Sequence, residues 1–214
     1  MTTIDAGSSA RAAGPDDRAR LNHVLAAAFL DDPIISWMVP DRPTRERFLP
    51  EMFDAFADAF ARHDATRLVA VDDDGSGGIG GIVGGAAMWS PPGVAPVHPD
   101  DEEAMTVRLV ELAGPHAERM GTCSAIFAEA HPAEPAWFLQ FLGVDPAHQG
   151  QGLGARLLRD ILDVADRNGE AAYLEATSDL NRRLYERHGF RWVADLPMPD
   201  GPTAYAMWRD PGAG

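Results

Sequence analysis

The sequence contains no lysine, so all 18 of its basic residues are arginines. A Walker-type phosphate loop requires the sequence Gly-Lys-Ser/Thr, and a Schiff base with pyridoxal phosphate requires a lysine amine. The missing lysine therefore excludes P-loop NTPases, kinases and pyridoxal-phosphate enzymes as classes for this chain.

Cysteine is nearly missing as well, because Cys123 is the only one. A single thiol forms no internal disulfide, which is typical of a reducing compartment, and it cannot build a multi-cysteine zinc site. The seven histidines show no HxxxH or similar ligand spacing. We therefore expect no metal, and we expect Cys123 to be an inert packing residue.

Long apolar runs are also lacking. No stretch of about eighteen uncharged apolar residues occurs, as a membrane span would need, and residues 1–20 lack the apolar segment of a secretory signal. We therefore expect a cytoplasmic protein that is not in a membrane.

Basic residues are the minority among the charged ones, with 18 against 33 acidic residues and a formal net charge of −15. This excess of negative charge repels a phosphate backbone, so we expect no nucleic acid partner. A chain of 214 residues that is 45% apolar and 24% charged fits one globular domain rather than a disordered chain.

Apolar periodicity and turn residues predict alternating helices and strands after a small, polar segment at 1–16, which we expect to be a mobile tail. Helices are expected around 21–29, 48–60 with Thr44 as N-cap, 100–130 with a break near Gly114, 157–168 and 182–187. Strands are expected at 67–71, 79–89, 137–144, 171–176, 190–195 and 203–208. The pattern predicts one α/β domain over residues 17–210.

A glycine-rich segment joins the apolar strand at 137–144 to the helix that follows, and it reads Gln149-Gly150-Gln151-Gly152-Leu153-Gly154-Ala155. Glycines let backbone N–H groups approach a ligand closely, and the start of a helix adds unpaired amides and a positive dipole end. The segment therefore predicts an anion site suited to a pyrophosphate. A simple connecting turn remains an alternative.

A dinucleotide-binding interpretation is a second alternative, because residues 150–155 also fit GxGxxA, with Glu170 or Glu175 near the place of a ribose-binding acid. Only about sixty residues follow this unit, and they end in strands without further crossover helices. The similar pattern at 75–80 follows three aspartates and precedes a strand, so we reject it as a pyrophosphate site.

A second polar segment spans residues 174–190, with a strand, a polar loop and a short helix. Asn181 and Tyr185 are four residues apart, so they share one face of that helix. Tyr185 is either a packing tyrosine or a proton donor at the reacting end of the ligand that the glycines bind.

In this order, Gln149-x-x-Gly152-x-Gly154 and Asn181-x-x-x-Tyr185-Glu-Arg-His-Gly-Phe190 resemble the two motifs of the GNAT N-acetyltransferase superfamily. The resemblance covers about residues 17–210 and is best from 135 onward. Within the superfamily, the segments 134–139, 143–149, 185–190 and 199–202 most resemble the puromycin N-acetyltransferase branch.

The resemblance implies a mixed, strongly bent sheet whose two central strands splay, with acetyl-CoA as co-substrate bound by a core at about 135–190. Backbone groups of Leu142 and Val144 would pair with the pantetheine amides, and Gly143 is the place where a backbone irregularity is easiest. The glycine segment 149–155 would hold the pyrophosphate, and Asn181 would touch the pantetheine arm. Tyr185 would protonate the departing thiolate, since a phenol (pKa about 10) keeps its proton where a thiol (about 8.5) begins to lose it.

The general base is open. Some GNAT enzymes carry a glutamate six residues before the position of Val144, and this chain has Phe138 there. The nearby candidates are Glu129, His131, Glu134 and Glu175. A water relay also suffices for a weakly basic amine, with a pKa of about 7.7 to 8, which mildly favours such an acceptor over a lysine side chain at about 10.4.

We expect acetyl transfer from acetyl-CoA directly to the primary amine of a small molecule. The helices at 17–63 would form the wall of the acceptor site with Phe29, Asp31, Asp32 and Trp37. The alternatives are a nucleotide-dependent oxidoreductase and a catalytically silent acyl-CoA-binding regulatory module. The identity of the acceptor and the oligomeric state stay open.

Overall fold

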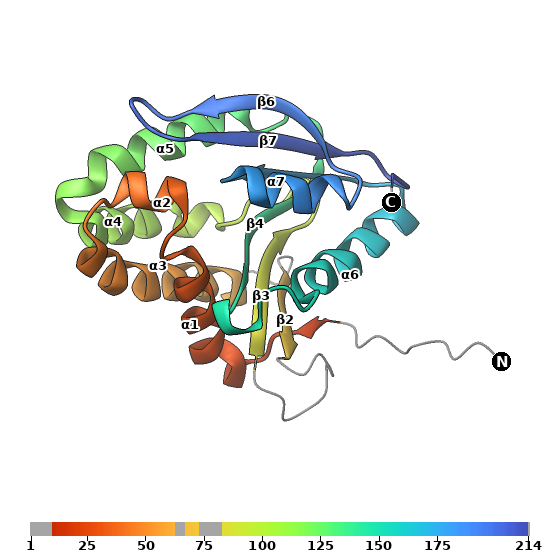
Figure 1. The fold of residues 1–214 in the computed structure, drawn as a ribbon, viewed down its shortest axis with the longest axis horizontal. Coiled ribbons are helices and arrows are strands. Elements are labelled where there is room, and N and C mark those ends of the chain that lie inside the picture. The colour runs from red at the N-terminus through yellow and green to blue at the C-terminus, as the bar shows by residue number, and fades with distance from the viewer. Residues whose placement is uncertain (1–9, 63–66, 73–82, 214) are drawn as a thin grey trace.

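The computed structural model describes residues 10–62, 67–72 and 83–213, and for residues 67–72 it describes the backbone alone. Its helices are α1 Arg18–Phe29, α2 Pro33–Met38, α3 Arg42–Arg62, α4 Glu102–Ala113, α5 Ala117–Ala130, α6 Leu153–Asn168 and α7 Asp179–Glu186 (Figure 1). Its strands are β1 Arg11–Ala12, β2 Arg67–Asp72, β3 Val83–Ser90, β4 Ala136–Val144, β5 Ala171–Ala176, β6 Arg191–Pro197 and β7 Thr203–Arg209. No described helix combines the length and the apolar character that crossing a membrane needs.

The described strands form one seven-stranded sheet in the order β1-β2-β3-β4-β5-β7-β6. Among these strands β4 and β5 pair in parallel, with α6 as the crossover, and the other pairs are antiparallel. In Figure 1, β6 and β7 run nearly crosswise to β3 and β4, so the sheet is strongly bent. The predicted mixed, bent sheet flanked by helices is confirmed.

The two central strands splay, as expected. The parallel ladder begins at Ala136 and Ala171 and stops at Leu139 and Leu174, although both strands continue. Beyond Leu139 the edge of β4 that faces β5 therefore lies outside this ladder.

The backbone irregularity lies at Gln140 and not at Gly143, so that expectation was wrong. Between β3 and β4 the register passes from Met88 opposite Phe141 to Trp89 opposite Leu139, which leaves Gln140 as an extra residue. Gly143 has a different role. A Cβ placed there would lie 2.9 Å from side-chain atoms of both Leu25 and Ala28, so the glycine lets α1 pack closely against β4.

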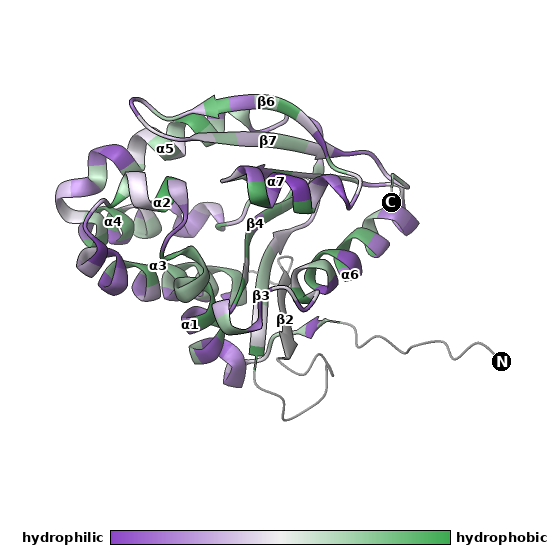
Figure 2. Ribbon diagram, viewed as in Figure 1, coloured by the Kyte–Doolittle hydropathy of each residue, from purple (hydrophilic) through white to green (hydrophobic). Residues whose placement is uncertain are grey.

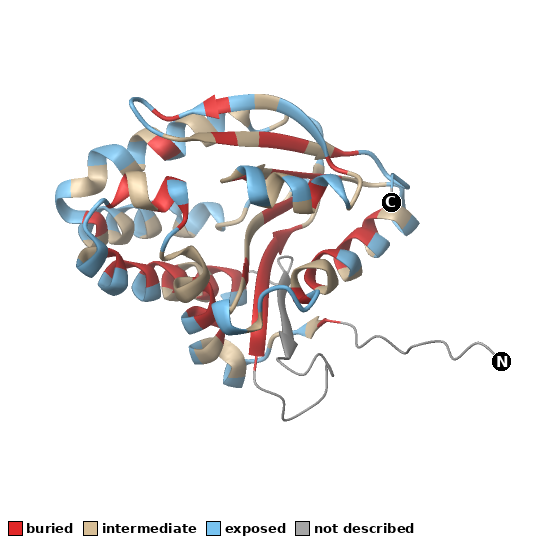
Figure 3. Ribbon diagram, in the orientation of Figure 1, coloured by how far each residue is buried: buried red, intermediate tan, exposed pale blue. Residues whose placement is uncertain are grey.

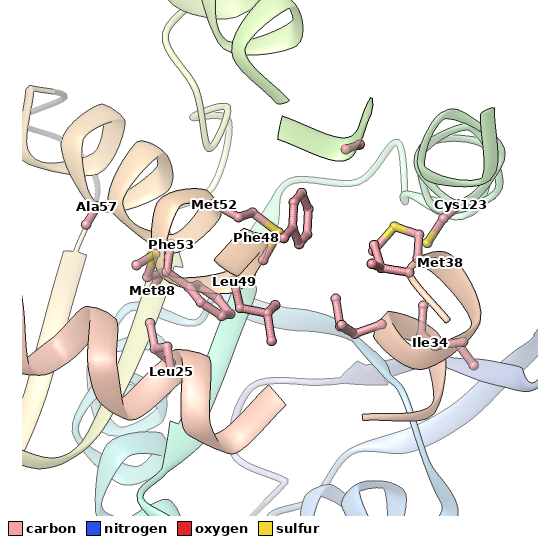
Figure 4. Close-up of a cluster of buried hydrophobic side chains, with 14 of the residues drawn as sticks. Leu25, Ile34, Met38, Phe48, Leu49, Met52, Phe53, Ala57, Met88 and Cys123 are labelled. Carbon is pink, nitrogen blue, oxygen red and sulfur yellow. The ribbon is translucent and has the colours of Figure 1, made fainter. Parts of the chain in front are cut away.

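Two apolar cores stabilise the sheet. One is shared with α1 to α5, and Figure 4 shows its central side chains, including Leu25, Phe53 and Met88. The other gathers the apolar stripe of α6 together with Tyr185 and Phe190. β3 is buried along its whole length between them (Figure 3), and the exposed faces of α3 and α6 carry the hydrophilic residues (Figure 2).

The sequence analysis did not predict α2, because the first helix was expected to end near residue 29 and the next to begin near residue 48, and proline disfavours a helical conformation in the residue before it. Proline at the first helical position needs no hydrogen-bond acceptor and starts a helix well. Here the Asp32 carboxylate caps α2 by accepting from the amides of Ile34 (2.9 Å) and Ile35 (3.1 Å).

The start of α3 also differs from expectation. Thr44 is not the N-cap, because Asp41 accepts from the Thr44 amide at 2.9 Å and from its hydroxyl at 2.6 Å, and the helix begins at Arg42. Within the expected tail, Arg11 and Ala12 pair with β2, while residues 1–9 lie outside the described part, as do residues 79–82 of the predicted second strand.

A buried ion pair fastens the end of β7 to α6. Arg209 is 2% exposed, and its guanidinium donates to both oxygens of Asp166 at 2.6 and 2.7 Å. Arg209 also donates to the carbonyl of His188 at 2.9 Å. The hydrogen bonds from Arg209 lower the pKa of Asp166 to about 2.

We expect Asp166→Asn to lower the free energy of unfolding by about 3 to 5 kcal/mol at pH 7, because it leaves a buried guanidinium without its counter-charge. A carboxyl whose folded pKa is depressed stabilises the fold above its unfolded pKa of about 3.9, and the contribution disappears as the pH falls toward 2. Urea unfolding at pH 7 and pH 3 should therefore show a smaller difference between the variant and the parent at pH 3.

The matched control is Glu46→Gln, which removes the carboxylate of an exposed pair with Arg42 at 3.3 Å. It should cost less than about 1 kcal/mol at either pH. An Asp166→Asn protein as stable as the control would show that the buried pair contributes no net stability.

Candidate active site

The glycine loop, residues 149–155, joins β4 to the first turn of α6. Asp145 holds its beginning in place, because its carboxylate pairs with Arg20 at 2.7 Å and accepts from the amide of Ala147 at 3.0 Å. Gly152 is the N-cap of α6 with φ +81°, and Gly150 has φ +78°. These left-handed conformations favour glycine, and the first amides of the helix that follows have no hydrogen-bond acceptor within the helix.

A groove of about 780 Å³, the glycine-loop groove, runs along this loop. All residues predicted to bind the cofactor line it except Gln151; they are Leu142, Gly143, Val144, Gln149, Gly150, Gly152, Leu153, Gly154, Ala155 and Asn181. The Val144 carbonyl accepts from the side-chain amide of Gln149 at 3.2 Å. The structure thus brings the loop, the splayed part of β4 and α7 together around one groove.

A partly open space of about 160 Å³, the inner cavity, adjoins this groove. The two share Phe29, Asp32, Leu142 and Asn181 in their walls. Tyr185 lines the inner cavity from α7, one turn after Asn181. The remaining walls come from α2 to α5 and from the splayed ends of β4 and β5.

Tyr185 is buried at 7% exposure. Burial, together with the negative charge of Asp32, raises the pKa of its phenol well above the usual value near 10. The phenol therefore keeps its proton throughout the neutral and mildly alkaline range.

Asp32 connects the start of α2 to the segment before α7. The Thr177 hydroxyl donates to Asp32, and Thr177 in turn accepts from the side-chain amide of Asn181 at 3.3 Å. Burial raises the pKa of Asp32, and the hydrogen bonds from Thr177 and from the α2 amides offset part of that rise. With three donors on its two oxygens, the Asp32 carboxylate is held in a fixed orientation.

Glu175 lines the inner cavity from β5, and it also lines a third space of about 610 Å³, the outer hollow. Burial raises the pKa of its carboxyl to about 8. The outer hollow brings Glu175 together with His131 and Glu134, two of the other candidates for the general base. Phe138, at the place of the expected glutamate, lies in the outer hollow and stacks on Tyr173.

The structure places the four predicted acceptor residues in different surroundings. Phe29 and Asp32 line the inner cavity, whereas Asp31 lies in the glycine-loop groove and pairs with Arg42 at 2.6 Å. Trp37 lines none of the three spaces. Its indole donates instead to the carbonyl of Pro199 at 3.1 Å.

The other predicted residues are also placed. Glu129 is exposed on α5 and lines none of the three spaces. Cys123 lines the inner cavity, and burial raises the pKa of its thiol to about 12, so it stays a neutral thiol.

Sequence reasoning missed two groups of lining residues. Arg187, His148 and His188 lie in the glycine-loop groove. Arg187 follows Tyr185 in the second motif, which is a signal that could have suggested it. The second group is the apolar lining of the inner cavity, which carries no motif; it includes Ile34, Ile35, Met38, Met52, Leu109, Met120 and Phe127.

Comparisons with known proteins agree with this arrangement. The model of the acetyltransferase (GNAT) family matches residues 32–190. N-alpha-acetyltransferase RimI of Mycobacterium tuberculosis is 36% identical over 117 residues, which cover 48% of this chain and 72% of that protein. L-methionine sulfoximine/L-methionine sulfone acetyltransferase of Salmonella typhimurium is 36% identical over 70 residues, which cover 31% of this chain and 40% of that protein.

The fold is also similar to a solved structure. The crystal structure of the histone acetyltransferase HPA2 and related acetyltransferase from Corynebacterium glutamicum superposes with a TM-score of 0.70 at 27% identity. The match covers 96% of this chain and 97% of that chain.

Proposed function

Because the chain belongs to the GNAT acetyltransferase family, whose members transfer an acyl group from acetyl-CoA, we propose that it acetylates the primary amine of a small molecule. One observation carries this proposal: the glycine-loop groove and the inner cavity adjoin where β4 and β5 splay, beside Asn181 and Tyr185. A thioester bound in the groove would reach an amine bound in the cavity.

The residues of the groove fit acetyl-CoA. The backbone amides at the start of α6 suit the pyrophosphate, and Arg187, which lines the same groove, adds positive charge. Past Leu139 the edge of β4 is outside the ladder to β5, so the pantetheine amides can pair with the backbone of Leu142 and Val144. Asn181 borders both spaces and would contact the arm near the thioester.

The reaction needs one proton acceptor and one proton donor. The amine nitrogen attacks the thioester carbonyl carbon, the new C–N bond forms, and the amine proton passes to the Glu175 carboxylate. The C–S bond then breaks, and Tyr185 gives its proton to the departing sulfur. Transfer of a proton from Glu175 back to Tyr185 through solvent completes the cycle.

Glu175 suits the role of base better than the other candidates. It borders the inner cavity, whereas His131 and Glu134 border only the outer hollow and Glu129 borders neither. A general base works best with a pKa near the operating pH, and burial places that of Glu175 at about 8.

The oxidoreductase interpretation is not favoured. Glu170, one of its ribose-binding candidates, accepts from the Trp137 indole at 2.7 Å and from the Asn168 side chain at 3.2 Å. After β5 the sheet continues with antiparallel β7, whereas a dinucleotide domain would continue with further parallel units.

The direct test is release of free CoA from acetyl-CoA in the presence of a panel of primary amines, with the acetylated amine identified by mass spectrometry. Calorimetry with acetyl-CoA accompanies it. Acetyl-CoA binding without CoA release for any amine would favour a silent acyl-CoA-binding module instead.

Gly152→Val should raise the acetyl-CoA dissociation constant by about 10- to 100-fold, because it strains the left-handed N-cap and disturbs amides worth about 1.5–3 kcal/mol to a charged ligand. The matched control is Gly169→Val. Gly169 has φ +70° and lies at the other end of the same helix.

Both variants should lose similar stability, and only Gly152→Val should bind acetyl-CoA more weakly in calorimetry. Equal dissociation constants for the two variants would contradict the assignment of the glycine loop to the pyrophosphate.

A further inference from the structure

The walls of the inner cavity are mainly apolar. Aromatic rings form much of it, and Phe56 meets Phe141 edge to face with ring centroids 4.9 Å apart. Methionine and branched aliphatic side chains from α2 to α5 complete the apolar wall; they are Ile34, Ile35, Met38, Met52, Leu109 and Met120. Apolar walls of this kind bind the hydrocarbon part of a ligand and offer few hydrogen-bond partners to additional polar groups.

The cavity is small. Its volume of about 160 Å³ is close to that of apolar protein cavities of about 150 Å³ that bind one benzene molecule. One ring or a comparable hydrocarbon chain therefore fills it. An aminonucleoside such as puromycin, with several ring systems, exceeds this volume.

The charged side chains that line the cavity, among the described residues, are both acidic: Asp32 and Glu175. They attract the ammonium of an incoming amine. A carboxylate on the same acceptor would lie beside Asp32 in a mainly apolar space, where the repulsion between like charges is weakly screened. A second ammonium would have to lie against the apolar walls without a partner, which is also costly.

From these three properties we infer that the acceptor is a monoamine with an apolar body about the size of one ring and with no carboxylate, such as an arylalkylamine. Its ring or chain would occupy the space between Phe29, Phe56 and Met120, and its amino group would face Asp32 and Glu175. This inference rests on the proposed function, because it assigns the inner cavity to the acceptor.

The first test compares 2-phenylethylamine with phenylalanine, which differs by the added carboxylate alone. With acetyl-CoA as donor, we expect kcat/KM for 2-phenylethylamine to exceed that for phenylalanine by about 100-fold or more. Puromycin and putrescine should also be poor acceptors. Equal rates for 2-phenylethylamine and phenylalanine, or a preference for phenylalanine, putrescine or puromycin, would overturn the inference while leaving acetyl transfer established.

Calorimetry with the same amines gives a readout besides turnover. If 2-phenylethylamine binds and phenylalanine does not, but no acetylated product forms, the selectivity of the cavity stands and the proposed acetyl transfer fails. If neither amine binds and neither is acetylated, the inference about the acceptor fails.

A pair of methionine variants tests the location. Met120→Ala lengthens the cavity, so the ratio of kcat/KM for 4-phenylbutylamine over 2-phenylethylamine should rise about tenfold or more, as expected for added room of a few methylene groups. Met105→Ala makes the same change at a half-buried methionine that does not line the cavity, and the ratio should stay constant. An unchanged ratio in Met120→Ala would show that the acceptor lies elsewhere.

Discussion

Tyr185→Phe should lower kcat by about 10²- to 10⁴-fold, the usual contribution of a positioned general acid. The variant keeps the ring, which packs edge to face against Phe190 at 5.9 Å between centroids, and removes the proton that the thiolate needs. Because the hydroxyl acts on the leaving group, the dissociation constant of acetyl-CoA should stay nearly unchanged. Stopped-assay kinetics and calorimetry measure the two quantities separately.

The pH dependence adds a second readout. Burial and the charge of Asp32 raise the pKa of Tyr185, so ionisation of this phenol should not limit the parent enzyme in the mildly alkaline range. A falling limb near the ordinary tyrosine pKa of about 10 would therefore need another cause.

Tyr205→Phe is the control, because Tyr205 is half-buried, lines none of the three spaces and has its hydroxyl on Asp179 at the start of α7, whereas the third tyrosine, Tyr173, interacts with the Glu175 side chain. The kcat of Tyr205→Phe should stay within about threefold of the parent, since the proton donor to the leaving group is intact. A folded Tyr185→Phe enzyme that is equally active, with chemistry limiting the rate, would show that the thiolate leaves without this residue.

Local sequence patterns were sufficient for the elements that carry the glycine loop. The apolar residues of α6 recur at helical spacing and are buried together, and Gly169 ends the helix in the left-handed conformation. The apolar run at 137–144 likewise predicted the strand β4, whose residues 137–139 are buried. Loop, strand and helix are consecutive in the chain, so their spatial relation follows from their order.

The inner cavity could not be predicted in the same way, because its residues meet across long separations in the sequence. Asp32 touches Thr177, which lies 145 residues later, and no motif connects them. Asp32 was predicted as an acceptor residue, but its capping of α2 was missed because the helix is only six residues long. The role of Gly143 was missed for the same reason: this glycine stays in register opposite Ala86, and what it permits is the close packing of α1, which lies more than a hundred residues earlier in the chain.

The sequence also left Glu175 as one of four possible bases, because burial decides its chemistry. A glutamate at the end of a strand has an ordinary pKa unless the tertiary structure removes water from it. Here β4 and β5 splay, the end of β5 forms a wall of the inner cavity, and burial raises the pKa of Glu175 to about 8.

Glu175→Gln should lower kcat/KM by about 10²- to 10⁴-fold at pH 9, where the parent side chain is ionised. In the parent, kcat/KM should rise about tenfold per pH unit below pH 8 and level off above it, because the carboxylate form accepts the proton. The variant should lose this limb, since an amide does not titrate.

The acceptor amine titrates as well, so the choice of acceptor decides how clear the result is. A fluorinated arylalkylamine has an ammonium that is more acidic than the Glu175 carboxyl. The rise in kcat/KM that comes from deprotonation of this amine therefore lies at a lower pH than the rise that comes from Glu175. With this acceptor, the parent profile should report the enzyme group alone.

Glu134→Gln is the matched control, because Glu134 borders the outer hollow but not the inner cavity. The Glu134→Gln variant should keep the kcat/KM of the parent and its rise with pH up to about pH 8. If instead Glu175→Gln keeps the limb and stays within about threefold of the parent above pH 8, the proton leaves by another route, for which His131 is the nearest candidate. Burial lowers the pKa of His131, so its imidazole is neutral and able to accept a proton at that pH.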